Sequence, residues 1–120
     1  MSLTLADLLE MKATMSVPST MCLVGSTSFS QVYQEANQRE TLAGRIVLTI
    51  GCDTKSDAML RLTTEDKIRL DLLHLHKIDR ADEVLVLNVG GYVGESTRRE
   101  IEYARMLGKV LRWLEPEVDA

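Results

Sequence analysis

Four short apolar segments constrain the fold of this chain more than any other feature. They cover residues 20–25, 45–51, 82–91 and 109–114, and the first three end in glycine. Their apolar residues follow one another without the polar alternation of a half-exposed strand. Unbroken runs of this length are typical of strands buried on both faces of a parallel sheet.

Helical patterns fill the intervals between these predicted strands. Three apolar stripes recur at helical spacing: Phe29, Val32, Tyr33 and Ala36, ended by Gly44; Ile68, Leu72, Leu75 and Ile78, with Thr64 as a candidate cap; and Ile101, Ala104 and Leu107, ended by Gly108. Alternating strands and helices predict an α/β fold with a doubly wound parallel sheet. Right-handed crossovers then place all strand carboxyl ends at one edge, where such sheets bind ligands.

Two segments lie outside this pattern. Residues 1–19 form a predicted N-terminal extension whose helix begins with a Thr4–Asp7 capping box and stops before Pro18. Residues 20–120 form the main domain, since 120 residues suffice for one core only. The segment from Cys52 to Thr63 follows the second strand, and we expect a loop there over the ligand edge.

The charge composition of the chain limits the kinds of molecule that it is expected to bind. The net charge of −4 argues against a nucleic-acid-binding face. Acids are interleaved among the clustered basic residues Arg98, Arg99, Arg105, Lys109 and Arg112, which predicts a solvated helix face.

No apolar run is long enough to span a membrane, and the acidic start does not resemble a secretory signal, so we expect a cytoplasmic protein. Cys22 and Cys52 lack the paired ligands of a zinc site or a disulfide framework, and we expect Cys22 to be a buried free thiol.

The first candidate site is "VGSTSFS", residues 24–30. A strand that ends in glycine, followed by three hydroxyl residues at a helix start, can hold an anion through free backbone N–H groups and the positive helix end. The alternative is that Ser28 or Ser30 caps the helix, and the local sequence favours this simpler role.

The second candidate site lies between the third strand and the last helix. Gly90 and Gly91 let the backbone approach a ligand closely, and hydroxyl residues follow at Ser96 and Thr97. Glu100 has two possible roles. With Thr97 as N-cap it completes a capping box. It also borders the buried stripe, and a carboxylate held partly out of water is suited to nucleophilic or acid–base chemistry. Spacing does not decide between them.

The third candidate is the pair His74 and His76. Two residues apart on a helix, they point to different faces and make a poor metal pair. His74 is the one placed to point toward the sheet edge, although a lone histidine of this kind is more often a hydrogen-bonded, half-buried residue. No ligand set suggests a metal or cofactor, and we expect none.

Three stretches together resemble the nucleoside 2-deoxyribosyltransferase-like proteins, within a small bacterial and phage branch. They are "CLVGSTSF", "EANQRETLAGRIVLTIG" and "HKIDRADEVLVLNVGGYVGESTRREIEYARMLGK", and the resemblance covers roughly residues 20–114. It implies a flavodoxin-like, three-layer α/β/α fold with four to five strands. It also implies cleavage of N-glycosidic bonds in nucleosides or nucleoside 5′-monophosphates, with Glu100 as the nucleophile.

The resemblance also implies roles at other positions. Gly25 and Ser26 match residues that hold the sugar or 5′-phosphate, and Ser96 matches phosphate-binding hydroxyls by region. His74 stands where the family has a carboxylate that assists base departure, a role that a histidine can fill. With few aromatic residues in the chain, Tyr92 is the candidate to stack a base. The substrate-binding residues that we predict are Gly25, Ser26, Thr27, Asn88, Gly90, Gly91, Tyr92 and Ser96.

The sequence therefore predicts an N-glycosidase or 2-deoxyribosyltransferase that acts through a glycosyl-Glu100 intermediate. The alternative is a non-catalytic nucleotide-binding or sensor domain of the same fold. In both cases the partner is a small nucleoside or nucleotide. We also expect a homodimer or larger homo-oligomer, because the short sheet and the extra helix leave apolar surface to cover.

Overall fold

The computed structural model describes residues 2–50 and 61–116, which form a four-stranded parallel sheet flanked by helices. The strands are β1 (Thr20–Val24), β2 (Ile46–Leu48), β3 (Glu83–Val86) and β4 (Val110–Trp113). The helices are α1 (Leu5–Thr14), α2 (Ser30–Leu42), α3 (Thr64–Arg80) and α4 (Glu95–Met106), with a short 3-10 turn η1 at Val89–Gly91. The predicted loop that begins at Cys52 lies almost wholly outside the described residues, as does Cys52 itself.

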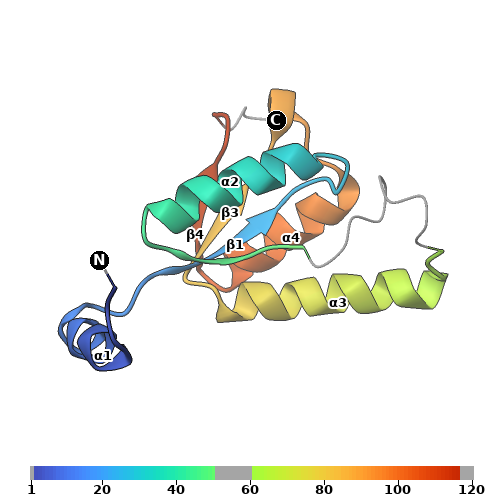
Figure 1. Ribbon diagram of the computed structural model, residues 1–120. Coiled ribbons are helices and arrows are strands. Elements are labelled where there is room, and N and C mark those ends of the chain that lie inside the picture. The colour runs from blue at the N-terminus through green and yellow to red at the C-terminus, as the bar shows by residue number, and fades with distance from the viewer. Residues whose placement is uncertain (1, 51–60, 117–120) are drawn as a thin grey trace.

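Three layers stack around the sheet, with α2 on one face and α3 and α4 on the other (Figure 1). On the α2 face, Tyr33 and Ala36 pack against β1 and β3. On the opposite face, Ile78 from α3 and Ile101 from α4 pack against the same two strands. Both central strands are thus covered on both sides, which confirms the predicted three-layer, doubly wound parallel architecture with four strands.

The strand order β2-β1-β3-β4 reverses the direction of winding between β1 and β3. The chain first moves outward from β1 to β2, and then crosses back over β1 to place β3 on its other side. Loops that leave β1 and β3 therefore diverge at their carboxyl ends and open a crevice between them. Such a switch point is where open α/β sheets bind ligands.

Helix α1 stands apart from these layers (Figure 1). It has the predicted Thr4–Asp7 capping box, in which each residue's side chain accepts a hydrogen bond from the other's backbone N–H. None of its residues is buried, and Leu5 and Leu9 are 72% and 55% exposed. No helix in the described part of the chain is long and apolar enough to cross a membrane. The cytoplasmic location and the division at residue 19 stay predictions.

Several local predictions were wrong in instructive ways. The third strand ends at Val86, because the left-handed backbone of Gly90 and Gly91 turns the chain into η1. The stripe predicted to bury Ile68 and Leu72 leaves both more than half exposed, since only the C-terminal part of α3 packs on the sheet. Leu107 is likewise 43% exposed. Thr63, one residue before the predicted Thr64, caps α3 in a capping box with Asp66.

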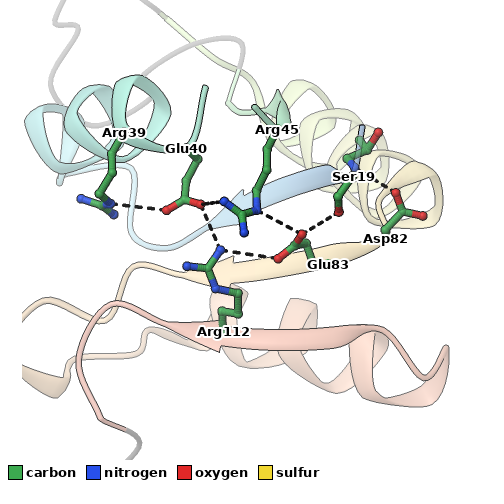
Figure 2. Close-up of polar contacts among 8 residues, drawn as sticks. Ser19, Arg39, Glu40, Arg45, Asp82, Glu83 and Arg112 are labelled. Atoms are coloured by element: carbon green, nitrogen blue, oxygen red, sulfur yellow. Dashed lines mark hydrogen bonds and ion pairs between the residues drawn. The ribbon is translucent and has the colours of Figure 1, made fainter. Parts of the chain in front are cut away.

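A charge network closes the α2 side of the sheet at the amino ends of β1 and β3 (Figure 2). Glu40 is 3% exposed and accepts hydrogen bonds from Arg45 and Arg112 at 3.1 and 2.9 Å. Glu83 accepts hydrogen bonds from the same two arginines and a third one, of 2.6 Å, from the Ser19 hydroxyl. Arg112 therefore belongs to β4 and to this network, not to the solvated helix face predicted for it.

These arginines also determine how the network titrates. Burial alone raises the pKa of Glu40, but the hydrogen bonds and charges of Arg112, Arg39 and Arg45 outweigh it, so the pKa lies below 4.5. A carboxylate whose pKa is lowered by folding stabilises the native state above its unfolded pKa. That contribution is lost as the pH falls through the lowered value.

We expect Glu40→Gln to lower the free energy of unfolding by about 2 kcal/mol at pH 7, because the substitution removes a buried charge that is hydrogen-bonded to arginines. The difference from the parent protein narrows as the pH falls below 4.5. Urea denaturation at several pH values measures both effects. Glu35→Gln, at an exposed position of the same helix, is the control and should change little. Equal stability of Glu40→Gln and the parent at pH 7 contradicts this account.

Gly25 is required where β1 meets the segment that follows β3. A Cβ atom at this position would lie 3.1 Å from Leu87 Cβ and 3.2 Å from the Leu87 carbonyl oxygen. We expect Gly25→Ala to destabilise the protein by about 1–3 kcal/mol, since a buried strand cannot shift without disturbing the sheet. The control is Gly94→Ala, whose Cβ would meet only the end of the Tyr92 side chain. Thermal unfolding of both variants tests this, and similar losses in the two would refute it.

Candidate active site

A cavity of about 540 Å³ opens at the switch point between β1 and β3. The segment that follows β1, one face of α3 and the first turns of α4 form its walls. The lining residues are Gly25, Ser26, Thr27, Tyr33, Ile50, Lys67, Leu70, Asp71, Leu73, His74, Lys77, Tyr92, Gly94, Glu95, Ser96, Thr97 and Glu100. Seven of the ten predicted site residues are among them.

Glu100 and His74 meet at the wall of this cavity. His74 Nε2 lies 2.9 Å from Glu100 Oε2, with the two side chains 10% and 16% exposed. One residue comes from α3 and the other from α4, and these helices pack side by side on the same face of the sheet. The structure therefore joins two residues that lie 26 positions apart and that the sequence placed at separate candidate sites.

Glu100 is not a capping residue. Helix α4 begins at Glu95 with Gly94 as N-cap, so Glu100 lies in the second turn, beyond the reach of the helix start. Thr97, the N-cap in that prediction, is inside the first turn and 3% exposed. The capping-box role is wrong because Gly94, with extended backbone and no side chain, starts the helix three residues earlier.

The surroundings of His74 favour its protonated form. Burial lowers the pKa of His74, but hydrogen bonds to Cys22 and Glu100 and the charge of Glu100 outweigh burial and raise the pKa to about 10. Cys22 is a buried free thiol, as predicted, and its Sγ lies 3.8 Å from His74 Nε2. At neutral pH the pair is thus an imidazolium beside a carboxylate, largely shielded from water.

Tyr33 supports the wall next to this pair. Its hydroxyl donates a hydrogen bond of 2.8 Å to the Gly25 carbonyl oxygen, which ties α2 to the end of β1. Burial, followed by the nearby charge of Glu100, raises the pKa of Tyr33, so the phenol keeps its proton. Tyr33 is therefore a fixed neutral donor in the cavity.

The hydroxyl residues after β1 do not cap α2. Phe29 is the N-cap and makes no side-chain capping hydrogen bond, so the predicted cap role of Ser28 or Ser30 is wrong. Ser26 and Ser28 instead hydrogen-bond each other at 2.8 Å. Tyr92 reaches across from the β3 side, and its ring packs edge-on against Phe29 with the ring centres 6.2 Å apart. These contacts join the two loops that border the cavity.

Three predicted binding residues lie outside the cavity lining. Asn88 is buried, and its side chain exchanges two hydrogen bonds of 3.0 Å with the backbone of Glu115. The Gly90 N–H donates to the Glu115 carboxylate, and Gly91 belongs to the same turn. The segment from Asn88 to Gly91 thus anchors the chain after β4, whereas Gly94 occupies the position beside the cavity.

Several residues of α3 that line the cavity were not predicted from the sequence. Lys67, Asp71 and Lys77 share a helix face with His74, at spacings of seven, three and three residues. Asp71 pairs with Arg99 at 3.7 Å, and Lys77 Nζ donates to the Thr49 carbonyl oxygen at 2.7 Å. The helical period counted from His74 would have found them. Within residues 2–50 and 61–116, no group of three or more His, Cys, Asp or Glu residues could hold a metal ion.

Comparison with known proteins identifies the fold. No protein-family model and no curated protein matches the chain. A solved structure of a 2-deoxyribosyltransferase from the psychrotolerant bacterium Bacillus psychrosaccharolyticus superposes with a TM-score of 0.58, at 16% sequence identity. The match covers 85% of this chain and 76% of that one. The chain therefore has the flavodoxin-like fold of that transferase, as its sequence predicted.

Proposed function

We propose that this protein cleaves the N-glycosidic bond of a nucleoside or a nucleoside 5′-monophosphate, with Glu100 as nucleophile and His74 as acid. The observation that carries the proposal is the 2.9 Å contact between the two side chains at the wall of the cavity. A carboxylate and a proton donor at one point of a cleft are the two groups that a retaining glycosidase needs.

In the first step, a Glu100 carboxylate oxygen attacks the anomeric carbon of the sugar. The C–N bond to the base breaks, its electron pair leaves with the base nitrogen, and His74 Nε2 gives that nitrogen its proton. In the second step, water or another base attacks the anomeric carbon and releases Glu100, while His74 takes up a proton. Two inversions give net retention of configuration.

The predicted substrate-binding residues divide into two groups in this proposal. Gly25, Ser26, Thr27 and Ser96 hold the sugar or its 5′ substituent, and Tyr92 stacks on the base. Asn88, Gly90 and Gly91 act indirectly, because their hydrogen bonds to the Glu115 segment fix the loop that carries Tyr92. Every role here is filled by side chains and backbone of this chain.

The base-release assay is the direct test. Purified protein is incubated with nucleosides and 5′-monophosphates, with and without a second base, and the released or exchanged base is quantified by chromatography. We expect Glu100→Gln to lower turnover at least 10³-fold while substrate still binds, because the amide cannot form the ester. Glu102→Gln, an exposed position on the same helix, is the matched control and should stay active.

The non-catalytic sensor gives a different result in the same experiment. No base is released across the panel, one nucleotide raises the melting temperature, and Glu100→Gln changes only that shift. This outcome would reject the glycosidase and favour the binding domain. Release by both the parent and Glu100→Gln would reject Glu100 as the nucleophile.

We also propose that the protein is at least a dimer, with α1 packing against a second copy. Alone in water, a ten-residue helix is marginal, and no described residue of α1 is buried. Light scattering should therefore give at least twice the mass of one chain. Replacing both Leu5 and Leu9 by Lys should return single chains, whereas Glu10→Lys, on the polar side of α1, should not. A monomeric parent protein at high concentration would refute the assembly.

A further inference from the structure

We propose that Glu100 controls the acidity of His74, so that His74 keeps its proton while Glu100 is a carboxylate and releases it when Glu100 becomes an ester. This coupling rests on the proposed function and extends it. It makes His74 a proton donor that is switched on by the covalent step itself.

The coupling follows from the isolation of the pair. Both side chains are at least 84% buried, and only 2.9 Å separates Nε2 from Oε2, so their charges interact through little water. In the resting site, burial lowers the pKa of His74 and the contacts with Cys22 and Glu100 raise it to about 10. An imidazolium held this firmly is a weak acid at neutral pH.

Among the described residues, Glu100 is the one carboxylate in contact with His74. From β1, the Cys22 side chain faces it, with Sγ 3.8 Å from His74 Nε2 and 3.8 Å from the Leu23 carbonyl oxygen. Tyr33 on α2 keeps its proton. On α3 itself, Asp71 is paired with Arg99, while Lys67 and Lys77 carry positive charge. No second carboxylate there replaces Glu100 when its charge is lost.

Esterification removes that charge. When Glu100 binds the anomeric carbon, one oxygen enters the C–O bond and the carboxylate becomes a neutral ester. The electron pair of the broken C–N bond passes to the departing base. Burial of His74 persists and favours neutral imidazole, and of the contacts that oppose burial only the one with Cys22 remains. The proton then moves from Nε2 to the base nitrogen, where negative charge has just appeared.

The second step runs the coupling in reverse. Neutral His74 accepts the proton of the attacking water or the N–H proton of an incoming base. Release of Glu100 from the sugar restores the carboxylate, and its charge holds the new proton on Nε2. The resting state is regenerated with no net change in protons on the protein.

Glu100→Gln mimics the ester, because an amide keeps the size and the acceptor oxygen but not the charge. The chain has two histidines, which makes imidazole NMR a direct readout. His76 is 77% exposed and serves as an internal reference in each spectrum. We expect ¹⁵N shifts at pH 8 to show protonated His74 in the parent and neutral His74 in Glu100→Gln. The protonation constant of His74 should fall more than tenfold, with His76 unchanged.

Glu102→Gln removes a charge from the same helix without touching His74, and His74 should stay protonated at pH 8 in this variant. Should Glu100→Gln fail to fold, Glu100→Met offers a second uncharged side chain of similar length. An unchanged His74 titration in a folded variant without the Glu100 charge overturns the coupling. An equal fall in Glu102→Gln overturns it too.

This titration needs no substrate and no turnover, so its result is independent of the base-release assay. If base is never released but His74 titrates with the Glu100 charge, the proposed function fails while the electrostatic coupling stands. If base is released but His74 does not respond to Glu100, the function stands and the switch fails. The two hypotheses are therefore separable on the same set of variants.

Discussion

The pairing of β1 with β3 is the constraint on which the rest of this structure depends. These two strands are covered on both faces, and in the described part of the chain they carry seven of the fourteen buried hydrophobic residues. Because the chain reverses its direction of winding between them, their following loops diverge and leave a cavity. The same packing that stabilises the domain therefore also creates the place where a small molecule can bind.

Two carboxylates with little exposure to water, Glu40 and Glu100, differ in their surroundings. Glu40 accepts hydrogen bonds from three arginines, so its charge is saturated and its role is structural. Among the residues that the structure describes, Glu100 is paired with His74, and it lines the cavity. A carboxylate surrounded by arginines is a poor nucleophile, whereas one that borders a cleft can react. This contrast is the physical reason to place chemistry at Glu100 and not at Glu40.

The apolar pattern was sufficient to predict four parallel strands, because a strand buried on both faces must be apolar on both faces. The capping box of α1 was also readable, since its two residues lie three positions apart and interact locally. Cap positions that are occupied by glycine could not be read from the sequence. Gly94 begins α4 without any side-chain signal, and this moved Thr97 and Glu100 into the helix.

The exposure of side chains along α3 could not be predicted from the local sequence pattern either. Ile68 and Leu72 continue the stripe of Ile78, yet that part of the helix does not pack on the sheet. The helical period describes which residues share a face, but not how much of that face meets a neighbour. The lining roles of Lys67, Asp71 and Lys77 followed from the same period only once His74 was known to face the cavity.

The sequence by itself determined the class of fold, the order of its elements and the edge of the sheet at which the cavity opens, since these follow from local apolar periodicity and the handedness of crossovers. Tertiary structure decided which polar residues meet. His74 and Glu100 belong to different helices and come within 2.9 Å only because α3 and α4 pack on one face of the sheet. Asn88 and Gly90 were turned away from the cavity by hydrogen bonds to Glu115, a residue 27 and 25 positions away. Such contacts depend on distances in space that spacing along the chain does not record.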